Sequence, residues 1–137
     1  MQTRPKHALM AAELLVEQHE KKISFSSLPA HLMPKTESEA YAVQSELFDL
    51  RKSRLGPIAG YKVALTSKVM QKLLQFPSPF SGPLHTQLIY TDGASITAAD
   101  YGRICIECEI AAVLKNDLLP RDQPYNASDI AGAIDTI

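Results

Sequence analysis

The stretch ICIECEIAAVL, residues 104–114, is the strongest β-strand signal in this sequence of 137 residues. Side chains along a strand alternate between the two faces of a sheet. The residues expected to face a core are Ile104, Ile106, Cys108 and Ile110. Glu107 and Glu109 are then expected together on the opposite face.

Two carboxylates on one face of an apolar strand repel each other and lose hydration. A hard divalent cation would offset both effects, because Mg²⁺, Mn²⁺ and Ca²⁺ prefer oxygen ligands. The alternative is an exposed strand face on which Glu107 and Glu109 simply meet water. The residues alone leave both interpretations open.

Further strands are predicted upstream of this stretch, at residues 61–66, 84–90 and 94–97. Ser67 is placed to cap a short helix that reaches about Gln75. The proline-rich segment 76–83 is expected to form a loop. Asp92-Gly93 is a turn signal.

Lys62 lies inside the predicted strand 61–66, which is apolar enough to be buried. A lysine in such a strand, next to a turn that opens a helix, can hold a carboxylate or move a proton. It can also snorkel, with its stem packed and its ammonium group in water. This choice also stays open at the level of the residues.

Two helices are predicted near the amino terminus, at about 5–21 and 36–53. The segment 23–35 between them contains serines and prolines and is expected to be a connector. Thr36 and Glu39 form a capping-box pattern at the start of the second helix.

Gly56-Pro57 is expected to end the second helix. A last amphipathic helix is predicted through Ile134, with Asn126 or Ser128 as its cap. Helices followed by strands indicate the α+β class.

The composition argues against several classes of protein. Lys plus Arg is 14 and Asp plus Glu is 15, so the net charge is −1 and a nucleic-acid-binding surface is not expected. No stretch approaches the roughly 20 apolar residues of a membrane span, and no signal peptide is recognised. The two cysteines are too few for a disulfide framework. We expect one soluble, cytoplasmic domain with no nucleic-acid or membrane partner.

Four short motifs occur in order along the chain: EAYAVQ at 39–44, GYKVALTS at 60–67, SPFSGPL at 78–84, and IECEIA at 106–111 followed by Asp117-Leu118. They resemble, in turn, a helical Ala-Tyr-x-x-Gln signature, a Gly-x-Lys-x-Gly-Leu-Thr stretch, a loop ending in Gly-x-Leu, and a metal-binding Glu-x-Glu strand. The family with this set is the fumarylacetoacetate hydrolase superfamily. Within it, the resemblance is to the branch of 2-oxopent-4-enoate hydratases and 4-oxalocrotonate decarboxylases.

The resemblance implies a fold in which amino-terminal helices lead into the first strands of a mixed β-roll, incomplete within these residues. Residues 1–57 would form the helical segment, and 58–137 the first part of the β-rich catalytic domain. The chain would correspond to about the first half of a family member. The strand 104–114 would then lack some pairing partners, so we expect association, including a homo-oligomer.

The resemblance also implies a chemistry. Family members bind Mg²⁺ or Mn²⁺ through the Glu-x-Glu pair and a third acidic residue, and the metal stabilises the enolate of a chelated 2-oxo acid. Carried over, Glu107 and Glu109 are metal ligands. Lys62 is a partner of the substrate carboxylate or enolate, or a proton shuttle. The residues implied as further substrate contacts are Leu65, Gly82 and Leu84.

The implied activity is that of a lyase in the meta-cleavage degradation of aromatic compounds. A hydratase of this kind adds water to 2-hydroxypenta-2,4-dienoate (2-oxopent-4-enoate) and gives 4-hydroxy-2-oxopentanoate. One alternative is 4-oxalocrotonate decarboxylase, a related enzyme that can pair with the hydratase. The other is a catalytically inactive truncated fragment or partner subunit.

Three departures from the family pattern bear on activity. Phe80 stands where hydratases of the branch commonly carry an acidic residue, and Ala64 stands where glycine is usual. The third metal ligand is expected after a proline beyond Ile137. The first and third departures favour the inactive alternative. Of the other polar residues, His85 is expected at the surface or rim, and Cys105 is expected to be a small packing residue.

Overall fold

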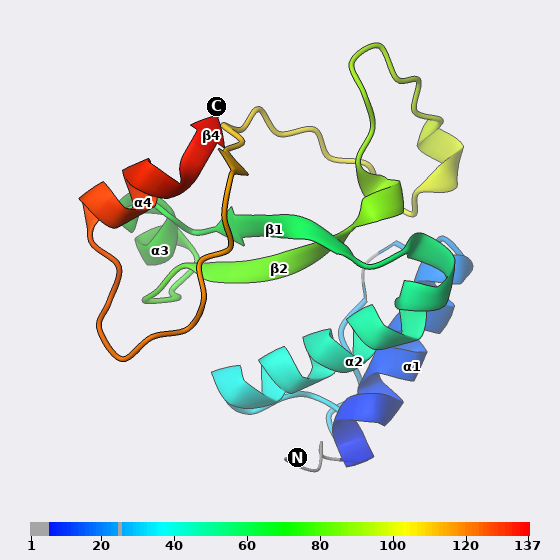
Figure 1. Ribbon diagram of the computed structural model, residues 1–137. Coiled ribbons are helices and arrows are strands. Elements are labelled where there is room, and N and C mark those ends of the chain that lie inside the picture. The colour runs from blue at the N-terminus through cyan, green and yellow to red at the C-terminus, as the bar shows by residue number, and fades with distance from the viewer. Residues whose placement is uncertain (1–5, 25) are drawn as a thin grey trace. The chain divides into compact units, whose positions relative to one another are not determined.

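The computed structural model describes residues 6–24 and 26–137. These residues form helices and short antiparallel strands, which confirms the α+β class (Figure 1). The chain forms two compact units, Met1–Ile104 and Cys105–Ile137. The predicted division at residue 57 stays a prediction.

The elements of the first unit are α1 (Lys6–Glu20), α2 (Glu37–Leu55), β1 (Ile58–Ala64), α3 (Lys68–Leu73), β2 (Phe80–His85) and two 3₁₀ turns, Thr86–Leu88 and Ala98–Asp100. Those of the second unit are β3 (Val113–Leu114), α4 (Ala127–Ala133) and β4 (Ile134–Thr136).

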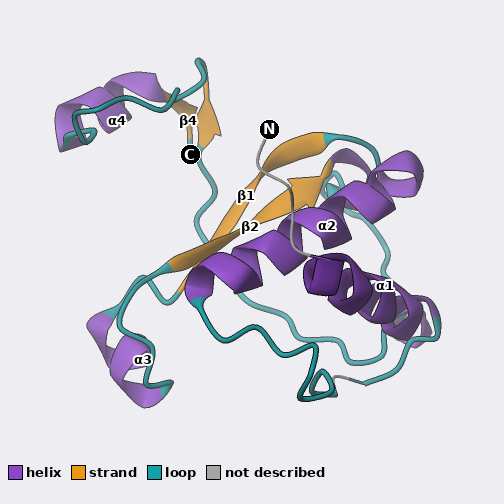
Figure 2. Cartoon of the chain, turned by 90° about the horizontal axis from the view of Figure 1, so that it is seen from below, coloured by secondary structure: helices purple, strands orange, loops and turns teal. Residues whose placement is uncertain are grey.

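Helices α1 and α2 lie side by side and carry the hydrophobic core of the first unit (Figure 2). Its buried residues are Ala8, Ala11, Ala12, Leu32 and Val43. Small alanine side chains favour both helix formation and close approach of a second helix. Both amino-terminal helices were predicted and are confirmed. The predicted start of the first, at Pro5, lies outside the described residues.

The ends of α2 follow from its capping residues. The Thr36 hydroxyl accepts a hydrogen bond from the Glu39 amide at 3.2 Å, as the capping-box pattern predicts. The Glu39 carboxylate, however, accepts from the Lys35 amide at 2.7 Å rather than from that of Thr36. The helix extends to Leu55, slightly past the predicted end, and Gly56 caps it with a φ of 83°.

Strands β1 and β2 form an antiparallel pair, and α3 lies between them in the sequence. Ser67 caps α3 as predicted. The predictions of a loop at 76–83 and a strand at 84–90 were wrong in their boundary, since β2 is Phe80–His85 and a 3₁₀ turn follows. Pro83 suggested a loop, but a proline is tolerated in a strand with a free edge. β2 has such an edge because β1 is its only partner in the described sheet.

The predicted burial of residues 61–66 was also wrong. The side chain of Tyr61 is 63% exposed and that of Val63 is 48% exposed. Helix α2 contacts β2 on one side of the pair. Lys62, between Tyr61 and Val63, is exposed as well, so most of β1 lies at the surface rather than only its alternate residues.

The strands predicted at 94–97 and 104–114 were largely wrong. The first forms no strand, and from the second only Val113–Leu114 pairs, with β4. A strand requires a neighbour for its backbone groups, and the described part of the second unit supplies this neighbour for two residues only. Ile106 and Ile110 are 86% and 87% exposed rather than in a core.

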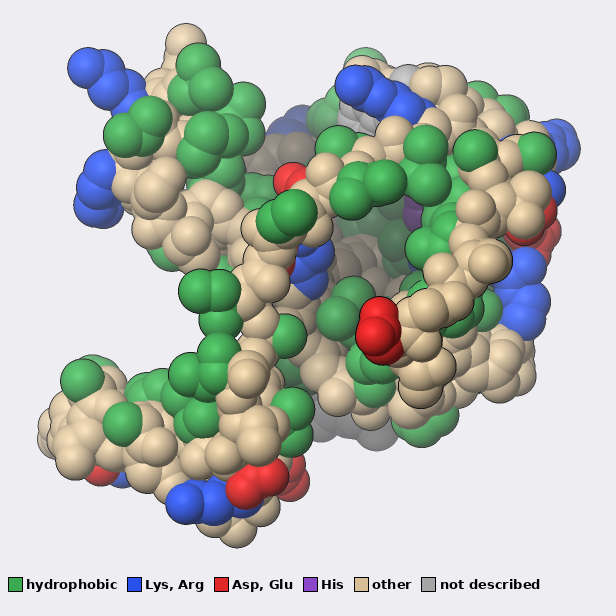
Figure 3. Space-filling model, turned by 90° about the horizontal axis from the view of Figure 1, so that it is seen from above, with side chains coloured by type: hydrophobic (Ala, Val, Ile, Leu, Met, Phe, Trp, Pro, Cys, Tyr) green, Lys and Arg blue, Asp and Glu red, His purple; other side chains and the backbone are tan. Residues whose placement is uncertain are grey.

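Other predictions for this region had mixed outcomes. The turn at Asp92-Gly93 is confirmed, and Gly93 has a φ of 81°. Cys105 and Cys108 are both exposed, so the prediction of a packing role for Cys105 was wrong. Figure 3 shows many hydrophobic side chains at the surface. None of the described helices combines the length and the apolar character that a membrane span requires.

Helix α4 begins with the predicted cap. The Asn126 side chain accepts a hydrogen bond from the Asp129 amide at 2.9 Å, and the Asp129 carboxylate accepts one from the Asn126 amide at 3.2 Å. Asp129 also pairs with Arg121, whose guanidinium lies 3.7 Å from the centre of the Tyr125 ring. Of the two predicted caps, the structure therefore selects Asn126.

Candidate functional site

One face of the β1–β2 pair collects most of the residues implied as substrate contacts. Lys62 lies directly opposite Gly82, and Ala64 lies opposite Phe80. Opposite residues of an antiparallel pair share a face, and so do alternate residues of each strand. Lys62, Gly82 and Leu84 are therefore on one face, together with Phe80.

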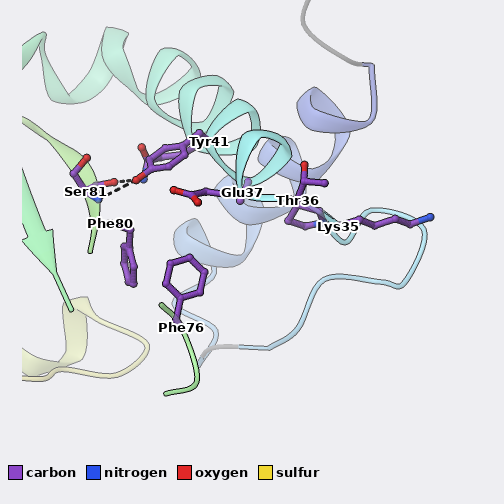
Figure 4. A pocket seen from close by; sticks show the side chains of 10 residues that line it. Lys35, Thr36, Glu37, Tyr41, Phe76, Phe80 and Ser81 are labelled. Atoms are coloured by element: carbon purple, nitrogen blue, oxygen red, sulfur yellow. Dashed lines mark hydrogen bonds between the residues drawn. The ribbon is translucent and has the colours of Figure 1, made fainter. Parts of the chain in front are cut away.

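This face of the strand pair is turned toward α2. A Cβ atom added to Gly82 would lie 3.4 Å from Nε2 of Gln44 on α2. Two α2 side chains form hydrogen bonds with the neighbouring backbone of Ser81 (Figure 4). Nε2 of Gln44 donates to the Ser81 carbonyl at 2.9 Å, and the Ser81 backbone amide donates to the Tyr41 hydroxyl at 3.2 Å. The motifs at 39–44 and 78–84 are thus joined by direct hydrogen bonds.

A cavity of about 420 Å³ opens beside these hydrogen bonds, at the amino-terminal end of α2. Its lining residues are Pro34, Lys35, Thr36, Glu37, Ala40, Tyr41, Gln44, Phe76, Phe80 and Ser81. Pockets that bind small molecules typically measure roughly 300–1,000 Å³ and are mainly apolar with a few polar groups. Both the size and the lining fit this description.

The cavity has an aromatic wall and an acidic group. The rings of Phe76 and Phe80 meet edge to face, with their centres 5.8 Å apart. Figure 4 shows the Glu37 carboxylate pointing between Tyr41 and these rings, while the Lys35 side chain extends away from them. The structure shows no hydrogen bond or ion pair of the Glu37 carboxylate with any other described residue.

Leu65, another implied substrate contact, lies in the turn between β1 and α3. Its φ of 56° is in the left-handed region, which a leucine adopts at a cost of about 1–3 kcal/mol. The Gln71 amide holds this turn by donating to the Leu65 carbonyl at 2.8 Å, and Gln71 is only 7% exposed. Such strain is concentrated at functional sites in proteins, which is consistent with the implied role of Leu65.

Glu107 and Glu109 lie in the second unit, in an exposed stretch without regular secondary structure. Among the described residues, no group of three or more histidine, cysteine, aspartate or glutamate side chains is arranged to hold a metal ion. The donor set itself suits a hard cation, because Mg²⁺ is commonly bound by one or two carboxylates with substrate and water oxygens. The metal assignment of this pair stays a prediction.

His85 is buried, and the prediction of a surface or rim position was wrong. It is 3% exposed, its ring stacks on Phe48 with centres 4.0 Å apart, and its Nδ1 lies 2.8 Å from the Gly56 carbonyl oxygen. These contacts fasten the end of β2 to the end of α2. His85 is a structural residue in this arrangement.

The sequence did not indicate the cavity or its residues Glu37 and Phe76; Tyr41 and Gln44 were identified as part of the motif at 39–44, but no contact was predicted for them. A signal was present in α2, because positions 37, 41 and 44 are spaced by four and three residues and so form one stripe of the helix. Nothing in the sequence indicated that this stripe would face the segment 76–81.

The chain is similar in sequence to several curated enzymes. It is 39% identical over 79 residues to the 2-keto-4-pentenoate hydratase of Burkholderia vietnamiensis, a match that covers 58% of this chain and 30% of that protein. It is 34% identical over 94 residues to the 2-keto-4-pentenoate hydratase of Paraburkholderia phymatum, covering 69% and 35%. It is 35% identical over 98 residues to the 2-oxo-hept-4-ene-1,7-dioate hydratase of Escherichia coli, covering 69% and 37%.

The chain is related in sequence to these hydratases. The resemblance to the hydratase branch is thereby confirmed for a partial chain, which spans about a third of the length of the curated relatives that it matches. No family model matches the chain, and no solved structure matches it significantly.

Proposed function

We propose that this chain carries the substrate-binding strands and two metal ligands of a divalent-metal-dependent hydratase. The reaction is the addition of water to 2-hydroxypenta-2,4-dienoate in aromatic catabolism, in a protein with a fumarylacetoacetate-hydrolase-like mixed β-roll. The similarity to hydratases named for such substrates supports the reaction class. The observation that carries the site is the gathering of Lys62, Gly82 and Leu84 on one face, beside a cavity.

The strand face supplies the means to bind a 2-oxo acid. The Lys62 ammonium group, with three donors and a full positive charge, would hold the substrate carboxylate or exchange a proton with its enol oxygen. Gly82, directly opposite, lets the Gln44 side chain of α2 lie close over the strand pair, because a Cβ there would come within 3.4 Å of its Nε2. Leu84 adds an apolar surface on the same face.

Glu107 and Glu109 would hold Mg²⁺ or Mn²⁺ through their carboxylate oxygens. When bound, such an ion polarises the 2-oxo group of the substrate and stabilises negative charge on its oxygen. Replacing Glu107 by glutamine removes the negative charge and nearly keeps the shape of the side chain, so this change tests the metal assignment.

The test is an assay of the chain with 2-hydroxypenta-2,4-dienoate and Mg²⁺, with the product identified as 4-hydroxy-2-oxopentanoate. We expect Glu107→Gln to lower activity by at least about 100-fold, because even residues that only support metal ligands contribute 10- to 100-fold. Glu13→Gln, an exposed change on α1, is the matched control. Unchanged activity of Glu107→Gln would remove the metal assignment, and CO₂ release from 4-oxalocrotonate without water addition would assign the decarboxylase instead.

A further inference from the structure

We propose that the cavity at the start of α2 receives the tail of the 2-oxo acid and selects an apolar tail over one that ends in a carboxylate. This inference rests on the proposed function, because it assumes that Lys62 holds the acid at its other end. It adds a specificity site made of Glu37, Tyr41, Phe76 and Phe80.

The strand register brings Lys62 and Phe80 close enough together for one substrate to contact both. Lys62 is opposite Gly82, and Phe80 is two residues from Gly82 on the same face, so Lys62 and Phe80 are diagonal neighbours. Diagonal neighbours in an antiparallel pair have Cα atoms about 7–8 Å apart. A short acyl chain whose carboxylate is bound at Lys62 can therefore reach the Phe80 ring.

The cavity is built to accept an apolar group. Two phenyl rings form one wall, and Pro34 and Ala40 add further apolar surface. Burial of apolar area is favourable in proportion to the area removed from water. An alkyl or aryl tail would thus gain affinity here from contact area alone.

The charges in the cavity oppose an acidic tail. The Glu37 carboxylate points into it, whereas the one cation among its lining residues, Lys35, extends away from the rings (Figure 4). The positive end of the α2 dipole, equivalent to about half a charge, is met by two acidic residues of the first turn, Glu37 and Glu39. A second substrate carboxylate would lose hydration beside a like charge, an arrangement that disfavours it.

The test compares two acids of equal length, 2-oxohexanoate and 2-oxohexanedioate, as ligands of the whole chain. Dissociation constants are measured by NMR titration. We expect 2-oxohexanoate to bind at least about tenfold more tightly, a difference of about 1.4 kcal/mol. Glu37→Gln should narrow this ratio at least threefold by strengthening the binding of the dicarboxylate, and Phe80→Ala should weaken the binding of 2-oxohexanoate. Glu13→Gln should leave the ratio unchanged.

The outcomes separate this inference from the proposed function. Binding of both acids that depends on Lys62, but with equal affinity and no effect of Glu37→Gln, would overturn the tail site and leave the proposed function intact. Binding that is unaffected by Lys62→Gln would overturn the proposed function and, with it, the inference. Absence of binding by either acid would overturn both.

Discussion

At the scale of single residues, His85 shows how one side chain fastens two elements. Its ring stacks on Phe48 within 3° of parallel, and its Nδ1 bonds the carbonyl of Gly56, which caps α2. Stacking and the hydrogen bond act at the same place, so loss of the imidazole removes both and leaves a cavity.

We predict that His85→Ala lowers the free energy of unfolding by about 2–4 kcal/mol, as expected for truncating a buried ring and stranding a polar partner. Urea titration followed by circular dichroism measures this change. His31→Ala, in the exposed part of the connector, should stay within about 0.5 kcal/mol of the parent chain. Equal effects of the two changes would contradict the structural role of His85.

His19 gives a pH dependence whose sign can be worked out. Desolvation lowers the pKa of His19 below its ordinary value of 6.5, and the positive charges of Arg51 and Arg54 lower it further. The folded chain therefore favours neutral His19. Its contribution to stability is fully present above the ordinary pKa and is lost as the pH falls through the lowered pKa.

We predict that the free energy of unfolding decreases between about pH 7 and pH 5, and that His19→Gln reduces this decrease. Urea titrations of both chains across this range provide the measurement. Identical pH profiles would show that His19 does not contribute.

At the scale of elements, the helices could be predicted because their signals are local. Thr36 and Gly56 mark the ends of α2 by chemistry that acts within a few residues. The stretch 104–114 has equally clear strand propensity, but a strand also needs a partner, and β4 pairs only with Val113–Leu114.

The candidate site also could be predicted only where its signals are local. The motifs identified Lys62, Gly82 and Leu84, and strand register explains why they share a face. The cavity depends on α2 meeting the segment 76–81, a tertiary contact that neither segment encodes by itself.

The cap of α4 is the element whose stability is easiest to test. Asn126→Ala removes the side-chain oxygen that accepts from the Asp129 amide and should destabilise the helix by about 1 kcal/mol. Amide hydrogen exchange across 127–133 should then accelerate about fivefold. Ser128→Ala is the control, since Ser128 lies inside the helix and is exposed. Faster exchange in Ser128→Ala than in Asn126→Ala would contradict the assignment of Asn126 as the cap of α4.

At the scale of the whole molecule, exposed apolar side chains are the main feature. Ile106, Ile110 and Leu119 of the second unit are each at least 66% exposed. Exposed apolar groups in such numbers favour association.

We predict that sedimentation velocity shows concentration-dependent self-association. Changing both Ile106 and Ile110 to serine should reduce it by removing apolar area, whereas Val69→Ser, at an exposed site on α3 in the first unit, should have a smaller effect. A monodisperse monomer over a wide concentration range would contradict this expectation.

The proposed function requires that the strand face around Lys62 binds a 2-oxo acid. An NMR titration of the chain with 2-oxopentanoate measures this binding. We expect saturable shifts of amide signals in β1 and β2, which Lys62→Gln abolishes and Lys72→Gln, at an exposed lysine of α3, preserves. Shifts that persist in Lys62→Gln, or no saturable shifts in these strands, would contradict it.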